Sequence, residues 1–198
     1  MTKIVCLNGH IGSGKDVAAK ALQPLGFENR KLSDPLTHAV RNLFDIEEYH
    51  GVKDRVYEEA FGRTFRHWQI AVAKMLHKES LYRGPLAHIL IRSYPKDSWD
   101  KVVISDLGRT EELEVLVAKF GAENILLISI ASTTDPHRFL EAEKAIPVAP
   151  TDDRKYVSVL EARTLGITTR KVSNDYTDKF KGEIIDAVQE WLLTKEEK

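Results

Sequence analysis

The sequence predicts an α/β fold in which helices cover both faces of a parallel β-sheet. Short apolar runs such as Lys3–Leu7 and 125–130 alternate with segments whose apolar residues have helical spacing. These runs are nearly continuous in Val, Ile and Leu, as expected for strands buried on both faces. Two long segments interrupt the alternation, so we expect one domain in which a core is interrupted by two insertions. The core comprises about 1–35, 98–131 and 167–198, and the insertions about 36–97 and 132–166.

The first part of the chain predicts two helices and two strands. After the first strand and a Gly-rich turn, residues 16–22 are strong helix formers with an apolar face, and Gly26 is expected to end that helix. A weaker strand is expected at 27–32. Asp34 followed by Pro35 marks the next helix, with Asp34 as N-cap and Pro35 at the first helical position. This helix is expected to run to about residue 44.

From residue 52 to about residue 94 the apolar spacing stays helical, with a break at Gly84 and Pro85. The remaining segments predict, in order, a strand at 102–106 ending in Asp106, a helix at 110–120, a strand at 125–130, an irregular stretch at 131–166, a strand at 168–172 and a closing helix at 177–193. The two strands at 102–106 and 125–130 belong to the expected sheet.

Composition narrows the class of protein. The chain has 198 residues, 29 of them basic and 30 acidic, with a formal net charge of −1. This balance gives no electrostatic footprint for general binding to nucleic acid or to an anionic membrane. No apolar stretch approaches the ~20 residues of a membrane span, and the lone Cys6 offers neither a disulfide framework nor a cysteine metal cluster. We expect a cytoplasmic protein with small-molecule partners, and a homodimer stays open.

The stretch after the first strand has the spacing of a phosphate-binding loop, Gly9-x4-Gly14-Lys15. Glycines let backbone N–H groups turn toward a polyphosphate, and the N-terminus of the following helix adds free donors and a positive dipole. Lys15 supplies a charge that can reach the β- and γ-phosphates. We expect the donor nucleotide to contact Gly9, His10, Gly12, Ser13, Gly14, Lys15, Asp16 and Val17.

Asp16 stands where such loops usually carry the Ser or Thr hydroxyl that binds Mg²⁺. A carboxylate is also a hard oxygen ligand, so Asp16 is a candidate metal ligand, directly or through water. Asp106, at the end of an apolar strand, is the second candidate. Two other interpretations stay open: Asp16 can favour the positive end of the helix, and Asp106 can cap the turn that follows it.

The loop Gly12–Asp16 resembles that of phage-type deoxynucleoside monophosphate kinases, and phosphomevalonate kinases carry a similar Gly-Lys-Asp loop. Further short resemblances cover most of the chain in patches: "LSDPLTHAVRNLF", "RHWQ", "VVISDLGRTEE" and "VSNDYTDKFKGEIIDAV". The resemblance implies a three-layer P-loop NTPase fold with a five-stranded parallel sheet. It also implies a helical acceptor-binding insertion (about 36–97), a lid (about 132–166), ATP as donor and Mg²⁺.

The resemblance also implies binding residues. Asp34 would line the acceptor site, Arg66 and Gln69 would belong to the acceptor-binding helices, and Asn174 would lie near the donor base. Asp106 and Arg109 would belong to the acceptor side as well. The family usually has Arg two residues after this Asp, whereas here Gly108 holds that position and Arg109 follows it.

Chemistry allows alternatives for two of these side chains. Arg66 can bind an acceptor phosphate bidentately, or it can pair with Glu59 on the same expected helix. Gln69 can read a base edge through paired hydrogen bonds, or it can face solvent.

Arginines in the expected lid complete the predicted site. Arg138, Arg154 and Arg163 lie in the segment 132–166, whose length is typical of a lid that closes over a reaction centre. Phosphoryl transfer needs cationic side chains that stabilise the negative charge on the transferring group. At least one of the three arginines is therefore expected to be catalytic together with Lys15. The alternative for each is a solvated surface arginine or a weak ion pair.

These features lead to a kinase hypothesis. The protein is expected to transfer the γ-phosphate of ATP to a nucleoside or deoxynucleoside monophosphate, a step of nucleotide biosynthesis. One alternative is a small-metabolite kinase similar to phosphomevalonate kinase. Another is a nucleotide-binding module without catalytic activity.

Overall fold

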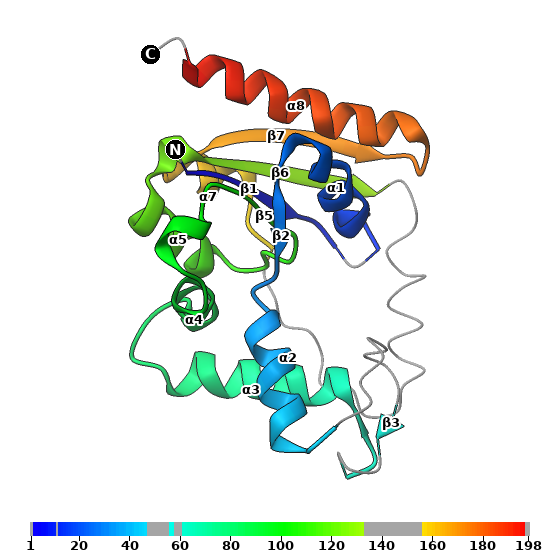
Figure 1. Ribbon diagram of the computed structural model, residues 1–198, viewed down its shortest axis with the longest axis vertical. Coiled ribbons are helices and arrows are strands. Elements are labelled where there is room, and N and C mark those ends of the chain that lie inside the picture. The colour runs from blue at the N-terminus through cyan, green and yellow to red at the C-terminus, as the bar shows by residue number, and fades with distance from the viewer. Residues whose placement is uncertain (1, 11, 47–55, 58–60, 133–155, 197–198) are drawn as a thin grey trace.

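A five-stranded, fully parallel sheet lies at the centre of the protein (Figure 1). The computed structural model describes residues 2–10, 12–46, 56–57, 61–132 and 156–196, and the structural statements concern these residues. The strand order is β2-β5-β1-β6-β7, with helices on both faces, which confirms the predicted fold class. The strands are β1 Lys3–Asn8, β2 Glu28–Arg30, β5 Lys101–Ile104, β6 Ile125–Ser132 and β7 Thr168–Asn174.

The central strand β1 is the point at which the direction of winding changes. In register, Val5 of β1 pairs with Val103 of β5 on one side and with Leu126 of β6 on the other. From β1 the chain passes to the edge strand β2, returns to β5, and then crosses to β6 and β7 on the opposite side. In open α/β sheets, ligands bind outside the carboxyl ends of the strands at this switch point. The segment that follows Asn8 therefore occupies the position where a ligand is expected.

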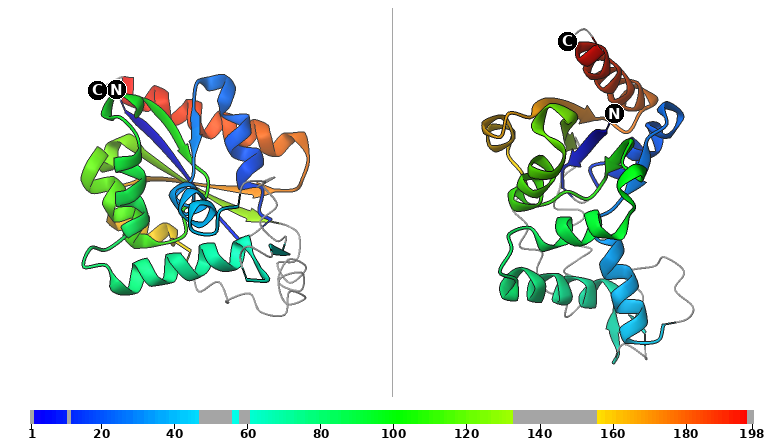
Figure 2. Two further views of the ribbon diagram at one scale, coloured as in Figure 1. Left: turned by 60° about the horizontal axis from the view of Figure 1, so that its bottom comes forward. Right: turned by 60° about the vertical axis from the view of Figure 1, so that its left-hand side comes forward.

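Two apolar cores lie on opposite faces of the sheet, and β1 contributes to both. Ile4 and Cys6 belong to one core, and Val5 and Leu7 belong to the other, as the two-residue period of a strand requires. Burial raises the pKa of the Cys6 thiol to about 12, so this cysteine acts as a small apolar core residue. Figure 2 shows the layers: α1 (Lys15–Ala21) and α8 (Asp178–Glu196) on one face, and α4 (Pro85–Ser93), α5 (Thr110–Phe120) and α7 (Val159–Thr164) on the other.

A smaller unit projects beyond the sheet, at the bottom of Figure 1. It contains α2 (Asp34–Leu43), α3 (Phe65–Glu79) and a hairpin of β3 (Val56–Tyr57) and β4 (Arg63–Thr64). A third apolar cluster, which includes Val40, Ile46, Tyr57 and Phe65, holds these elements together. The Thr64 hydroxyl accepts a hydrogen bond from the His67 N–H and caps α3.

The expectation of a helix from residue 52 onward is wrong for the described part before Phe65. Strands β3 and β4 occupy that part, and the chain turns between them at Phe61 and Gly62, whose φ angles are 54° and 66°. Phe61 is 78% exposed, so its place in the apolar spacing did not reflect a buried helical face. The three- and four-residue spacing is real only from Phe65, where α3 begins.

Other boundaries moved by smaller amounts. Helix α2 begins at Asp34 with Ser33 as N-cap, one residue earlier than expected. Gly26 ends a short 3-10 turn, Gln23–Leu25, whereas α1 already ends at Ala21. The stretch 131–166 is not irregular throughout, because β6 continues to Ser132 and α7 forms at Val159–Thr164. The helix at 110–120 is confirmed without change. Two more 3-10 turns are Lys96–Ser98 and Ala122–Asn124.

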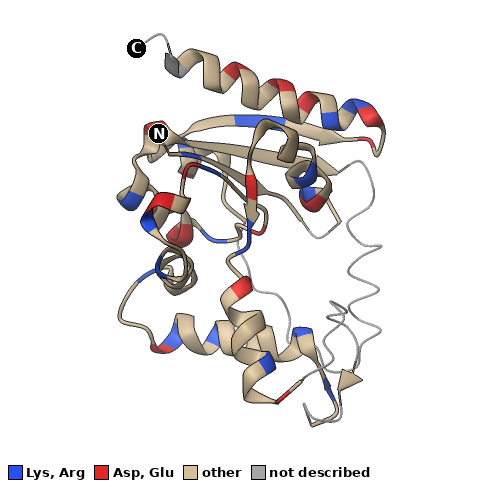
Figure 3. Cartoon of the chain, viewed as in Figure 1, with Lys and Arg blue, Asp and Glu red and all other residues tan. Residues whose placement is uncertain are grey.

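The apolar length of the helices and the distribution of charge over them bear on the kind of ligand to expect. In the described parts of the chain, no helix combines the length and the apolar character needed to cross a bilayer. Basic and acidic positions are interspersed over the helices of both faces (Figure 3). The charge at a site on these helices therefore has to be judged from the individual ion pairs there.

Candidate phosphate-binding site

The loop between β1 and α1 has the glycine-dependent geometry that its sequence predicts. Gly12 and Gly14 have φ angles of 75° and 95°, in the left-handed region that side chains disfavour. A Cβ on Gly9 would lie 2.6 Å from the Ser13 Oγ and 2.7 Å from the Ile130 carbonyl oxygen. Glycine is therefore required both for the turn and for the close approach of the loop to β6.

Lys15, the first residue of α1, folds back over the loop. Its Nζ donates to the Gly9 carbonyl oxygen at 2.5 Å and to the His10 carbonyl oxygen at 2.7 Å. The His10 carbonyl also accepts from the Ser13 N–H at 3.1 Å, which closes the turn. The ammonium is thus held directly above the loop, at the N-terminus of a helix, where phosphate oxygens bind most readily.

The turn between β7 and α8 holds the loop from one side. The buried Asn174 donates from Nδ2 to the Ser13 carbonyl oxygen at 2.9 Å, and its Oδ1 accepts from the Tyr176 N–H at 2.8 Å. The Tyr176 hydroxyl donates to the Gly12 carbonyl oxygen at 2.9 Å. A tyrosine hydroxyl has one proton, so the contact of 2.7 Å with the Ser132 Oγ places Ser132 as its donor.

These bonds orient the loop amides. In a trans peptide the carbonyl and the following N–H point in opposite directions. Because the Ser13 carbonyl points at the Asn174 amide, the Gly14 N–H of the same peptide points away from that amide. The Asn174 amide thus positions the loop, and its place near the donor base stays a prediction.

The segment before α7 holds the opposite side. The Asn8 Nδ2 donates to the Val157 carbonyl oxygen at 2.7 Å, and the His10 ring meets the Tyr156 ring edge-on with centroids 4.6 Å apart. The loop is therefore fixed from both flanks, and the hydrogen bonds that fix it span 149 to 164 positions of the chain. Val17, the third residue of α1, is exposed and follows Lys15 and Asp16 in the first turn of that helix.

Asp16 has an ion pair that the sequence analysis missed. Its Oδ1 lies 2.7 Å from the Lys31 Nζ, and the Asp16 side chain is 78% exposed. Burial lowers the pKa of Lys31, but the hydrogen bond to Asp16 and the charges of Asp16, Asp106 and Asp34 outweigh it, and the net pKa is raised. Lys31 is therefore a permanently charged ammonium beside the loop.

Asp106 lies at the neighbouring strand end, where it is committed to the backbone. Its Oδ1 accepts from the Leu32 N–H at 2.7 Å, and its Oδ2 accepts from the Ser33 N–H at 3.0 Å. This geometry supports the capping interpretation of Asp106. Within the described ranges, no group of three or more His, Cys, Asp and Glu side chains is placed to hold a metal ion. Of the two predicted metal ligands, the exposed Asp16 fits a metal that arrives with a bound nucleotide, and Asp106 fits a structural role.

The predicted acceptor residues lie on α2, α3 and the start of α5. Asp34 accepts from the Lys31 N–H at 2.9 Å and so closes the turn into α2. Gln69 is buried on α3, and its Nε2 donates to the Thr37 Oγ1 of α2 at 2.8 Å. Its burial rules out the solvent-facing alternative, and the base-reading role stays a prediction, with one of the two Nε2 protons already engaged between the helices. Arg66 lies half-buried one turn earlier on α3.

Arg109 precedes α5, and the buried Glu112 stiffens this start. The Glu112 Oε2 accepts from the N–H groups of Gly108 and Arg109, at 3.3 Å and 3.1 Å. The other Glu112 oxygen lies 3.8 Å from the Nε2 of His77 on α3. Arg109 is thereby placed at the carboxyl edge of the sheet, next to the element that follows Asp106.

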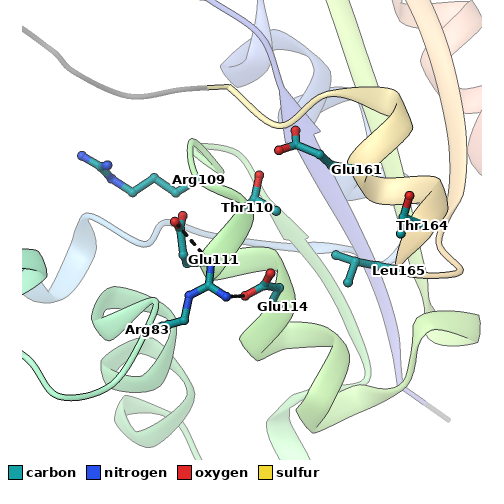
Figure 4. A pocket seen from close by; sticks show the side chains of 8 residues that line it. All are labelled: Arg83, Arg109, Thr110, Glu111, Glu114, Glu161, Thr164 and Leu165. Atoms are coloured by element: carbon teal, nitrogen blue, oxygen red, sulfur yellow. Dashed lines mark ion pairs between the residues drawn. The ribbon is translucent and has the colours of Figure 1, made fainter.

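A pocket of about 740 Å³ lies beside Arg109, between α5 and α7. In Figure 4, Arg83 points at two of the acidic residues, with Nη distances of 3.6 Å to Glu111 and 3.0 Å to Glu114. Arg109 reaches away from Thr164 and Leu165 (Figure 4). Since three glutamates face two arginines in this pocket, and Arg83 is already paired, its charge does not favour a polyphosphate. Its lining is Arg83, Arg109, Thr110, Glu111, Glu114, Glu161, Thr164 and Leu165.

Of the three predicted lid arginines, Arg138 and Arg154 lie outside the described residues. Arg163 belongs to α7, and its Nε donates to the Thr169 Oγ1 at 3.2 Å. Thr169 is five residues before Asn174 on β7, or about 16 Å along an extended strand. In the structure this bond to Thr169 directs Arg163 at β7, and its catalytic role stays a prediction.

Two residues of the site were missed from the sequence. Lys31 follows the weak second strand directly, and Tyr176 stands two residues after Asn174 in the turn before α8. A basic residue at a strand end, next to an unusual carboxylate in the loop, was the available signal for Lys31. No local signal could have revealed the bond from Tyr176 to Gly12, since 164 positions separate them.

Comparison with known proteins supports the fold. Neither a protein-family model nor a curated protein matches the chain. A solved structure from Chloroflexus aurantiacus, provisionally described as a kinase, is 13% identical with a TM-score of 0.51 and covers 98% of this chain and 97% of its own. At this identity the likeness concerns the fold alone.

Two further solved structures are more distant. The protein TT1252 from Thermus thermophilus is 18% identical over 95% of this chain and 96% of its own, with a TM-score of 0.45. A dephospho-CoA kinase from Campylobacter jejuni is 14% identical over 96% of this chain and 97% of its own, with a TM-score of 0.36. Neither carries the argument further.

Proposed function

We propose that this protein is a phosphotransferase that moves the γ-phosphate of ATP to a nucleoside or deoxynucleoside monophosphate. The observation that carries the proposal is the braced loop Gly9–Lys15 at the switch point of the sheet. Asn174 and Tyr176 hold the Ser13 and Gly12 carbonyls, and the Lys15 ammonium lies against the Gly9 and His10 carbonyls. The Gly14 N–H and this ammonium would be the donors offered to a ligand at the mouth of the loop. A polyphosphate is the ligand that fits such a set of donors.

The loop residues would bind and orient the donor. The Gly14 N–H and the N-terminus of α1 would donate to the phosphates, and Lys15 would exchange its two carbonyl partners for the β- and γ-phosphate oxygens. Asp16 is the residue that would hold Mg²⁺, directly or through water. When bound, that ion neutralises charge on the β- and γ-oxygens. Little covalent work by the protein is then needed, because the acceptor phosphate attacks in line.

The acceptor side of the proposal comprises the insertion 36–97 and residues next to it. Arg66 on α3, with Asp34 at the start of α2 and Arg109 before α5, would line it, and the two arginines are cations that suit an acceptor phosphate. Arg138 and Arg154, in the proposed lid at 132–166, would stabilise the negative charge on the transferring group. We place this reaction among the ATP-dependent steps of nucleotide biosynthesis, in the cytoplasm.

One observation favours a second candidate, a kinase for a small phosphorylated metabolite. The Gln69 Nε2 donates to Thr37, so one of the two amide protons that were expected to read a base edge is already engaged. An acceptor recognised through its phosphate and an apolar surface would not need that amide. The resemblance of the loop to phosphomevalonate kinases points to the same alternative.

A coupled assay of ADP release tests the proposal. ATP and Mg²⁺ would be supplied with a panel of ribo- and deoxynucleoside monophosphates, and with small phosphorylated alcohols as the second arm. ADP release with a monophosphate is the expected result. Release only in the second arm would favour the small-metabolite kinase. Tight ATP binding without release in either arm would mean a nucleotide-binding module and would contradict both enzyme proposals.

The variant Lys15→Ala tests the loop itself. Because Lys15 is expected to meet the β- and γ-phosphates, turnover should fall by at least ~100-fold, as for loss of an electrostatic donor at a transferring group. Circular dichroism should stay unchanged, since the Lys15 ammonium bonds to carbonyls of the loop itself. Full activity in this variant would sink the assignment of the loop.

A further inference from the structure

The residue before Lys31, Arg30, is held by contacts with Tyr94, Trp99 and Ser98. Arg30, only 1% exposed, is stacked between the rings of Tyr94 and Trp99, with its Cζ 3.9 Å and 4.6 Å from their centroids. Its Nη2 also donates to the Ser98 carbonyl oxygen at 2.8 Å. These contacts anchor the end of β2 immediately before Lys31.

Two aspartates fix the backbone on the other side of Lys31. Asp106 accepts from the N–H groups of Leu32 and Ser33, and Asp34 accepts from the Lys31 N–H. The chain therefore leaves β2 along one path, and the Lys31 side chain starts from a defined point. A preorganised side chain loses less entropy when it binds a ligand.

The Lys31 ammonium is directed at the first turn of α1. It bonds to the Asp16 Oδ1 at 2.7 Å, and the Lys31 side chain is 32% exposed. An ammonium has three protons, and in the described part of the chain this one meets a single hydrogen-bond acceptor. Two donors of a fixed cation thus remain beside the mouth of the phosphate loop.

This arrangement also answers the problem that Asp16 poses. A carboxylate at the start of α1 places negative charge where phosphates would bind, and like charges at such short range repel. The Lys31 ammonium, bonded to the Asp16 Oδ1, offsets that charge. A loop with Ser or Thr at this position would need no such cation.

We propose that Lys31 is a second phosphate-binding lysine, which donates to the terminal phosphate of the donor nucleotide while Asp16 holds it in place. The proposal rests on the proposed function, because it assumes that the loop binds a polyphosphate. It adds a residue to that site and assigns Asp16 a second role, as the anchor of this lysine. Lys31 leads into α2, so it would sit between the donor and the acceptor side.

Equilibrium binding measured by calorimetry tests this role. The probes are ATP and inorganic tripolyphosphate, which carries the phosphates without a base. The variant Lys31→Met should bind both roughly 10- to 100-fold more weakly than the wild type, the loss typical of a hydrogen bond between charged groups. Lys31→Arg should retain most of the affinity. Lys20→Met, which removes an exposed lysine from the last turn of α1, is the matched control and should bind like the wild type.

Thermal unfolding of each variant separates binding from folding. Lys31→Met should melt close to the wild type, because an exposed ion pair contributes little stability. If it unfolds, Lys31→Gln provides the same comparison with a polar side chain.

Unchanged affinity for ATP and tripolyphosphate in Lys31→Met or Lys31→Gln would overturn the role of Lys31. An equal loss of affinity in Lys20→Met would overturn it too, since the effect would then be one of general charge. A wild type that binds ATP but releases no ADP with any acceptor contradicts the kinase proposal, and the affinities still decide the role of Lys31. A wild type that binds neither probe overturns both.

Discussion

Asn174 and Tyr176 each hold the loop backbone by one side-chain hydrogen bond to a carbonyl oxygen. Tyr176 itself has a positive φ of 63°, an unusual conformation for a residue with a side chain, and this turn aims its hydroxyl at the Gly12 carbonyl. Asn174 lies so close to Gly14 that a Cβ there would overlap its amide. The loop and its brace are thus complementary in shape, and a change on either side should be felt at the ligand.

The variant Tyr176→Phe isolates the hydroxyl. It keeps the ring and removes the bond to Gly12, so ADP affinity should fall by about 2- to 10-fold, the range of one net hydrogen bond. Calorimetric titration with ADP measures this effect. Tyr82→Phe is the matched control, because Tyr82 is 73% exposed in the turn between α3 and α4. Equal affinities in the wild type and Tyr176→Phe would show that the loop keeps its shape without the brace.

Among the elements, the contact between α4 and α5 depends on a glycine. Gly84 caps α4 with φ 60°, and a Cβ on it would lie 2.5 Å from the Glu111 carbonyl oxygen and 2.9 Å from the Glu111 carbonyl carbon. Both atoms are backbone and cannot move aside alone. This close approach seats α4 on the first turn of α5, the turn that follows Arg109.

The variant Gly84→Ala should therefore destabilise the protein by more than conformational strain alone. A left-handed conformation costs an alanine roughly 1–2 kcal/mol. Gly62→Ala provides that strain by itself, since Gly62 has φ 66° and a Cβ there would meet nothing within 4 Å. Urea unfolding should rank Gly84→Ala clearly below Gly62→Ala in free energy of unfolding. Equal losses would mean that α4 shifts on α5 without cost.

For the molecule as a whole, the sheet joins two cores that share the strand β1. The helices α1 and α8 pack together on one of its faces, with Trp191 buried in that core and Lys3 placed 5.5 Å from its ring centroid. The same face carries the loop at the start of α1 and the brace before α8. Stability of this core and geometry of the site are therefore linked through two helices.

Truncation of the large core residue tests that link. Trp191→Ala should lower the free energy of unfolding by about 3–5 kcal/mol, the range for loss of a buried aromatic side chain. Leu193→Ala, on the exposed side of the same helix at 64% exposure, should stay within about 0.5 kcal/mol of the wild type. Urea unfolding followed by fluorescence or circular dichroism measures both. Similar losses in the two variants would contradict the packing of α8 described here.

Local chemistry made part of this protein predictable. The runs that became β1 and β6 are apolar throughout, and the helix at 110–120 carries acids at its start and Gly121 at its end. The loop could be predicted because its glycines and lysine follow one another in the chain. The hairpin before Phe65 could not, since the same apolar spacing fits a helix when exposure is unknown.

The sequence by itself therefore determined the class of fold, the strand after which the loop forms, and the chemical nature of the groups that the loop offers: glycine amides, one lysine and one carboxylate. Only the tertiary structure decided which side chains hold that loop and which cation offsets Asp16. Asn174 and Tyr176 reach the loop across more than 160 positions of the chain, and Lys31 reaches Asp16 across 15. Such contacts arise from strand order and packing, because a parallel sheet brings distant strand ends to one edge whatever their separation in sequence.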